Sequence, residues 1–161
     1  MNHSQEYVIT SNDRVGTDTI DNFSIQLNDK LKNVYACELL SFIVPNLGGV
    51  TTNPFIRLNI STNSNDNKWR KIEDSSSSLN INAGNQTSFI IQPNTINTTD
   101  SFINTSILSN PVIDFSKQFT IVPMLTFNIT DCFGNPFNFG GLTALTKANT
   151  ITIVLRLYFK Q

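Results

Sequence analysis

Few side chains in this sequence could do covalent or metal chemistry. His3 is the single histidine among 161 residues, and it lies at the start of the chain, where termini commonly fray. We therefore expect neither a serine or cysteine nucleophile with a histidine base nor a histidine-ligated zinc or iron site. Cys37 and Cys132 are too few for a disulfide framework or a four-cysteine metal site. Because Cys37 lies in an apolar run, a buried reduced thiol is expected there.

The remaining residues that could support catalysis or ligand binding are carboxylates and phosphate-binding glycines. Glycoside hydrolysis needs two carboxyl groups at a fixed separation, and the candidates are Glu38, Asp114 and Asp131. Nothing in their spacing brings two of them together. The glycine pairs at 48–49 and 140–141 lack the spacing of a phosphate-binding loop. We therefore predict that the protein is not an enzyme and that it carries no cofactor and no metal.

The charge composition argues against nucleic acid and membranes as partners. Eleven Lys and Arg against twelve Asp and Glu give a net charge of -1, whereas proteins that coat nucleic acid cluster their cations. The densest cationic group, at 68–71, surrounds Trp69, and we interpret it as a strand edge with an interface tryptophan. No apolar run reaches the roughly 18 residues of a membrane span, and no signal sequence opens the chain. We therefore expect synthesis in the cytoplasm.

The surface is predicted to be polar but nearly uncharged. Charged residues make up only 14% of the chain, well below the roughly 25% of a typical soluble domain. Asn, Ser and Thr occupy the polar positions instead. Such a surface resists association weakly, because charge repulsion helps to keep proteins monomeric. It suits a subunit that packs against neighbours, although a sugar-coated or extracellular surface would have the same composition.

The elements that must position these residues are strands. The last stretch, 151–160, carries Ile, Ile, Leu, Leu and Phe at odd positions and mostly polar residues at even ones. Alternation with period two predicts a strand with one buried face, roughly 33 Å long. Residues 22–27 and 125–130 alternate in the same way. So do residues 55–60, with Arg57 and Asn59 predicted to face outward.

The remaining pattern completes an all-β prediction. Residues 34–44 are apolar on nearly both faces, as expected of a central strand, and Pro45 ends it. Shorter candidate strands lie at 68–73, 79–83, 87–92, 112–115 and 119–122. No segment has a convincing helical period, and the nearest, 100–108, would form a helical turn or two at most. About eight antiparallel strands in one domain, 1–161, favour a single jelly-roll β-sandwich with little or no helix. Hydrophobic residues are 39% of the chain and include 12 phenylalanines, enough for a sizeable core.

Three groups of segments then carry a resemblance. The first is YVITSNDR at 7–14 with FSIQL at 23–27; the second is CELLSFIVPN at 37–46 with FIRL at 55–58; the third is LTFNITD at 125–131, FGNPFNF at 133–139 and the closing strand. Their order resembles that of the small single-jelly-roll minor capsid or penton proteins of large eukaryotic DNA viruses, virophages and polinton-like viruses. The resemblance covers most of the chain, but residues 61–119 have no counterpart in it.

The resemblance implies a structural protein of a double-stranded DNA virus, located in the virion. Such a subunit associates with itself, as a homopentamer at capsid vertices, or with a major capsid protein, and does not contact nucleic acid directly. Residues 1–12 are a possible extended N-terminal arm, which could add a strand to a neighbour's sheet edge. The residues expected at subunit interfaces are Tyr7, Val8, Ile9, Trp69 and Phe137.

Two alternatives stay open at this point. A carbohydrate-binding jelly roll, as in a lectin or a receptor-binding spike module, would use an exposed aromatic ring such as Trp69 or Phe137 beside Asn and Asp side chains. A coat protein that packages its genome directly would need a basic arm. That variant is disfavoured, since Arg14 is the only Lys or Arg among the first fifteen residues.

Overall fold

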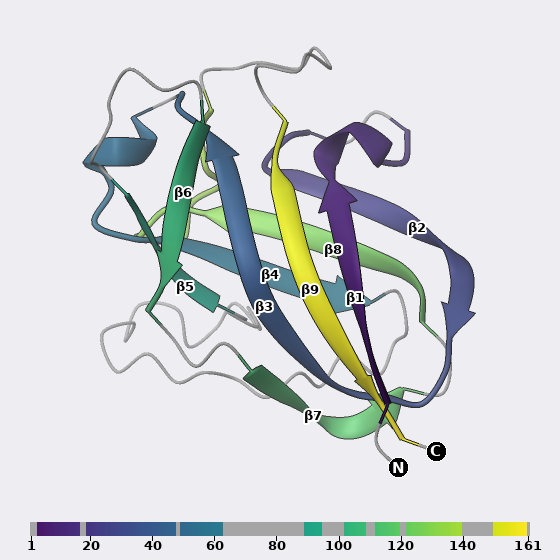
Figure 1. Cartoon of the computed structure of the whole chain (residues 1–161). Helices are drawn as coiled ribbons and strands as arrows, with labels where there is room; N and C mark the ends of the chain where they lie inside the picture. The colour runs from purple at the N-terminus through teal and green to yellow at the C-terminus, as the bar shows by residue number, and fades with distance from the viewer. Residues whose placement is uncertain are drawn as a thin grey trace.

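The fold is built almost entirely of antiparallel strands (Figure 1). The computed structural model describes residues 3–16, 19–47, 49–62, 89–94, 102–108, 112–119, 122–139 and 150–160. These residues form two short 3-10 helices, η1 (Ser11–Asp13) and η2 (Val50–Thr52), and no α-helix. Their nine strands are β1 (His3–Thr10), β2 (Asn22–Leu31), β3 (Val34–Pro45), β4 (Ile56–Thr62), β5 (Phe89–Pro93), β6 (Phe102–Ile107), β7 (Val112–Phe119), β8 (Val122–Thr130) and β9 (Thr152–Phe159).

The strand pairing follows a nested pattern. If β7 is set aside, because it pairs only with β3, the first of the remaining eight strands pairs with the last, β1 with β9. The second then pairs with the seventh, β2 with β8, the third with the sixth, β3 with β6, and β4 with β5. This is one long antiparallel ribbon, rolled up so that β9 also meets β3 and β8 also meets β4. The predicted jelly roll is confirmed.

Rolling the ribbon produces two layers. The β9 sheet has the order β1-β9-β3-β6 and the β8 sheet has the order β5-β4-β8-β2, and Figure 1 shows their strands crossing one behind the other. Strand β6 belongs to both, since 102–104 pair with β3 while 105–107 pair with β5. The layers are therefore joined along one side by β6. On the opposite side the strand order ends at β1 and β2.

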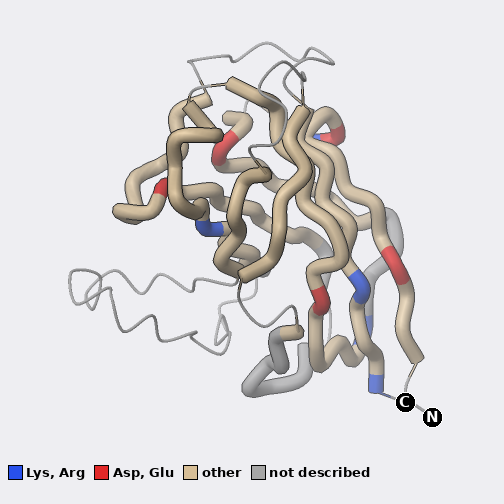
Figure 2. The backbone as a smooth tube through the Cα atoms, turned by 60° about the vertical axis from the view of Figure 1, so that its left-hand side comes forward, with Lys and Arg blue, Asp and Glu red and all other residues tan. Residues whose placement is uncertain are grey.

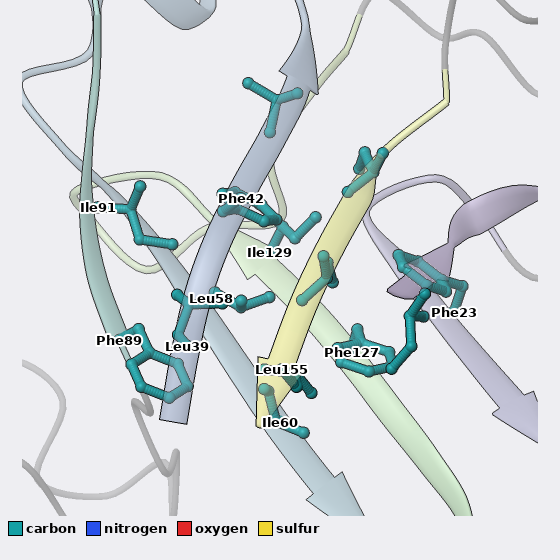
Figure 3. Packing of buried hydrophobic residues seen from close by; sticks show 14 of the residues in the cluster. Phe23, Leu39, Phe42, Leu58, Ile60, Phe89, Ile91, Phe127, Ile129 and Leu155 are labelled. Carbon is teal, nitrogen blue, oxygen red and sulfur yellow. The ribbon is translucent and has the colours of Figure 1, made fainter. Parts of the chain in front are cut away.

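The core lies between the two sheets (Figure 3). From the β9 sheet, the odd residues of the closing strand from Ile151 to Leu157 are buried, as their alternation predicts. The β8 sheet contributes Phe23 and Phe127, whose stacked rings have centroids 5.2 Å apart. Further fully buried side chains include Leu39, Phe42, Leu58, Ile60, Phe89, Ile91 and Ile129. The large phenylalanine rings thus fill space between the two sheets that smaller β-branched side chains would leave empty.

Two local features differ in detail from the sequence expectation. The segment 100–108, where at most a helical turn or two was expected, contains strand β6, because its backbone groups are engaged by β3 and β5 in succession. Tertiary pairing overrides a weak local preference here. Arg57 lies on the face of β4 away from Ile56 and Leu58, as predicted, but it is covered there: it is only 6% exposed, and its guanidinium carbon lies 5.7 Å from the centroid of the Phe55 ring. Of the shorter candidate strands, 68–73 and 79–83 lie outside the described residues.

The possible N-terminal arm is also corrected. Residues 3–10 do not extend away from the rest of the chain, because β1 pairs along its whole length with β9, from His3 opposite Phe159 to Thr10 opposite Thr152. The physical reason is the alternation of the segment itself. Ile9 is 5% exposed and belongs to the core, and Tyr7 is half-buried against it. Among the described strands, the segment is an edge strand of the chain's own sheet.

Replacing Phe127 with alanine should lower the free energy of unfolding by about 3–5 kcal/mol, since it leaves a cavity beside Phe23 in the middle of the core. Phe133→Ala is the matched control. That ring is 81% exposed, so its removal should change stability by no more than about 0.5 kcal/mol. Urea denaturation of both variants measures the difference. Equal losses would contradict the assignment of Phe127 to the core.

Deleting residues 1–12 should impair folding rather than release a stable monomer. The deletion exposes core that Tyr7 and Ile9 cover, at about 1.5–3 kcal/mol per fully buried apolar side chain, against a typical total stability of about 5–15 kcal/mol. Thermal unfolding followed by circular dichroism should show a much lower midpoint or no cooperative transition. A truncated chain that melts like the full-length protein would refute this role of β1.

Candidate interaction sites

Of the residues predicted at interfaces, Tyr7 is half-buried against the core. Val8, on the outer face of β1, is 70% exposed and therefore available to a partner. Ile9 and Phe137 are core residues instead, and Phe137, only 3% exposed, packs against Phe139 with ring centroids 4.5 Å apart. Phe137 therefore presents no ring to a sugar or a neighbouring subunit. Trp69 lies outside the described residues.

A charged cluster crosses the outer face of the β9 sheet. Arg156 in β9 stands opposite Glu6 of β1 on one side and Glu38 of β3 on the other. Its Nη2 donates to Oε1 of Glu6 at 2.6 Å, and its Nη1 donates to Oε2 of Glu38 at 2.9 Å. One guanidinium thus bridges three adjacent strands at a single level of the sheet, and it fixes their register.

Tyr158 completes this cluster. Its hydroxyl donates to the same Glu38 Oε2 at 2.6 Å. This hydrogen bond raises the pKa of Tyr158, because ionisation would remove the donor beside a carboxylate. The pKa of Arg156 is raised as well, first by its hydrogen bond to Glu6. Glu38 Oε2 therefore accepts hydrogen bonds from two side chains of β9, Arg156 and Tyr158.

The other candidate groups for chemistry are Cys37, Asp131 and Asp114. The Cys37 thiol is buried, and burial raises its pKa, so it stays neutral and a poor nucleophile. Asp131 caps a loop, and Asp114 is placed only as a backbone position in β7. Among the described residues no three His, Cys, Asp or Glu side chains lie close enough to hold a metal ion. The described segments also include no helix that is long and apolar enough to cross a membrane.

A rigid loop after β8 presents an exposed aromatic ring. The Asp131 Oδ1 accepts hydrogen bonds from the main-chain N–H groups of Phe133 and Asn135, both at 2.9 Å. The main-chain N–H of Asp131 donates to the Asn135 carbonyl at 2.9 Å, and Gly134 turns the chain with φ 89°. Phe133 stands at this turn, 81% exposed. The sequence signal that could have revealed this loop is an Asp followed by Gly-Asn, with an aromatic residue between.

A cleft of about 470 Å³ lies between the two strands that end the sheet order. Its lining comes from β1, η1 and β2: Tyr7, Val8, Ile9, Asp13, Ile25, Gln26 and Leu27. The volume falls within the range of about 300–1,000 Å³ that is common for ligand sites. No local pattern could have predicted this cleft, because it depends on which two strands lack a second neighbour.

The surroundings of these features are poor in charge. Figure 2 shows Lys, Arg, Asp and Glu spaced widely along the described chain, most of it tan. Exposed large apolar side chains are present instead among the described residues: Val8, Val15, Phe102, Leu108 and Phe133. The accessible features with distinct chemistry are therefore the Phe133 loop and the cleft between β1 and β2.

Comparison of the sequence with protein-family models finds no match, and comparison with curated proteins finds none either.

Replacing Glu38 with glutamine should lower the pKa of Tyr158 toward the ordinary tyrosine value of about 10, because it removes the charged acceptor. In the wild type the raised pKa means that the folded state holds this proton more tightly than the unfolded chain. The hydrogen bond therefore contributes fully at neutral pH, and its contribution disappears as the pH rises through the raised pKa. Ultraviolet titration of tyrosinate, with Tyr158→Phe to assign the transition, measures the shift.

The control is Glu6→Gln, which removes the other carboxylate on Arg156 but leaves the acceptor of Tyr158 in place. Its tyrosine titration should stay closer to that of the wild type than the titration of Glu38→Gln. If Glu38→Gln leaves the titration unchanged, the hydroxyl does not bond to Glu38.

Proposed function

We propose that this protein is a structural virion subunit, a penton or minor capsid protein that assembles by protein–protein contacts at capsid vertices or against the major capsid shell. The observation that carries the proposal is the rolled ribbon of eight strands, with its order β1-β9-β3-β6 and β5-β4-β8-β2. Jelly rolls of this kind form viral capsid and lectin domains. The fold is also the one that the resemblance in strands β1, β2, β3, β4, β8 and β9 implies.

The surface supports assembly. The two sheets are joined through strand β6 and form a rigid sandwich. Because the chain carries few charges, electrostatic repulsion opposes close packing against a neighbouring molecule only weakly. Phe133 adds a suitable anchor, because an aromatic ring on a preorganised loop loses little conformational entropy when it is buried by a neighbour. A carbohydrate-binding role has less support, since Phe137, one of the two rings proposed for it, is buried in the core.

Ring symmetry sets a further requirement. A closed ring such as a pentamer uses heterologous contacts, in which one patch meets a different patch on the next copy. In our proposal the Phe133 loop is one of these patches, and it inserts its ring into the neighbouring copy. The partners are other copies of this chain and a major capsid protein, within the virion and without direct contact to nucleic acid.

Mass photometry and negative-stain electron microscopy of the purified chain, over a range of concentrations, test the proposal. We expect closed rings of discrete mass, five-fold for a vertex protein. Phe133→Asp should weaken ring formation by roughly 2 kcal/mol or more, about thirtyfold, while the melting temperature stays near that of the wild type. A chain that remains monomeric at every concentration, with and without a major capsid protein, would overturn the proposal.

The matched control for the loop is Val15→Asp, which places the same charge at another exposed apolar residue outside the Phe133 loop. It should assemble like the wild type. If both variants assemble equally well, Phe133 is not an interface residue, and if both fail equally, the effect is one of added charge rather than of this ring.

A further inference from the structure

The cleft between β1 and β2 lies where the strand order ends. Within the described residues, β1 pairs only with β9 and β2 pairs only with β8. Both strands therefore have one edge that no described strand covers. The lining of the cleft shows that these two edges face the same space, and Figure 1 places β1 and β2 on the same side of the molecule.

The hydrogen-bond register shows which peptide groups point into this space. The Ser11 N–H donates to the Ile151 carbonyl at 2.9 Å, so along β1 the odd residues direct their main-chain groups toward β9. Even residues such as Glu6 and Val8 must direct theirs toward the other edge. Val8 thus offers an N–H and a C=O at the cleft.

The same reasoning applies to β2. The Ile129 N–H donates to the Asp21 carbonyl at 2.7 Å, so the odd residues of β2 bond to β8 and the even ones point away from it. The Ser24 carbonyl confirms this direction, because it accepts a hydrogen bond from the Val15 N–H at 2.9 Å, on the side away from β8. The next even residue is Gln26, whose peptide group faces the cleft opposite β1.

The side chains on either side of these peptide groups are apolar. Tyr7 and Ile9 flank Val8, and Ile25 and Leu27 flank Gln26; all four belong to the hydrophobic core or pack against it. Asp13 adds one carboxylate to the lining, and it accepts a hydrogen bond from the Thr10 hydroxyl at 2.8 Å. The site combines two strand edges, an apolar floor and one negative charge.

We propose that this cleft binds an extended segment of a partner protein, which adds as a strand antiparallel to β1. An extended peptide has alternate N–H and C=O groups that match the edge of β1, and it can place every second side chain on the apolar floor. A compact apolar molecule would cover the floor but leave the strand-edge groups unpaired. The segment we expect has apolar residues at alternate positions and a Lys or Arg near Asp13.

This inference does not rest on the proposed function, because a jelly roll in any setting could accept such a segment. It also separates two surfaces. The Phe133 loop follows β8, whereas the strand-accepting cleft involves β1, η1 and β2. Loss of one kind of binding should therefore leave the other in place.

The test uses the full chain and a displayed library of random peptides. We expect the selected peptides to carry apolar residues at alternate positions with a basic residue, and to slow amide hydrogen exchange at Val8 and Gln26. Val8→Pro removes an N–H that faces the cleft and no hydrogen bond to β9, so peptide affinity should fall at least about tenfold. Asp13→Asn should remove the preference for a basic residue.

Ser4→Pro is the matched control. Ser4 is another even residue of β1, with its N–H at the same edge, but it does not line the cleft, so peptide affinity should be unchanged. Equal affinity of Val8→Pro and the wild type for the selected peptides would overturn the proposal. So would selected peptides without the alternation, or bound peptides that leave exchange at Val8 and Gln26 unaltered; this exchange measurement needs only the wild-type chain.

Discussion

The double pairing of the closing strand is the constraint on which the rest of this structure depends. Strand β9 lies between β1 and β3, so the last described strand joins the first to the third. Its inner side chains fill one wall of the core, and its outer Arg156 links the two neighbouring strands through Glu6 and Glu38. The β1-β9 pair is the outermost pair of the rolled ribbon. The pairs β2 with β8, β3 with β6 and β4 with β5 are nested inside it.

Local alternation made much of this fold predictable from sequence. The closing strand, β2, β4 and β8 each carry apolar residues at every second position, and burial follows that pattern in their described side chains apart from Arg57 and Thr130, which are buried too. What sequence could not supply is pairing between distant residues. Strand β6 has no strong pattern of its own and exists because β3 and β5 both bond to it. The N-terminal segment looked separable for the same reason, since its partner lies about 150 positions away.

The candidate interaction sites were harder to predict than the fold. Phe133 and Phe137 lie four positions apart in one aromatic segment, yet one ring is exposed and the other is buried. The difference arises from hydrogen bonds: Asp131 holds Phe133 at a turn, whereas the Phe137 N–H donates to the Ile129 carbonyl and draws its ring toward the core. Side-chain type alone cannot separate these outcomes. The cleft is still less visible, because it arises from the absence of a pairing among the described strands.

The position of the β1 and β2 edges also bears on our proposal that copies of this chain assemble into rings. A ring built by strand addition would need complementary edges on opposite sides, so that each copy could extend the sheet of the next. Here β1 and β2 face the same cleft, and β6 joins the sheets on the other side. Addition of the β1 edge of one copy to the β2 edge of the next therefore cannot propagate around a ring. In the assembly that we propose, contacts between copies would use other surfaces, such as sheet faces and loops, whereas the β1 and β2 edges suit a single extended segment from another chain.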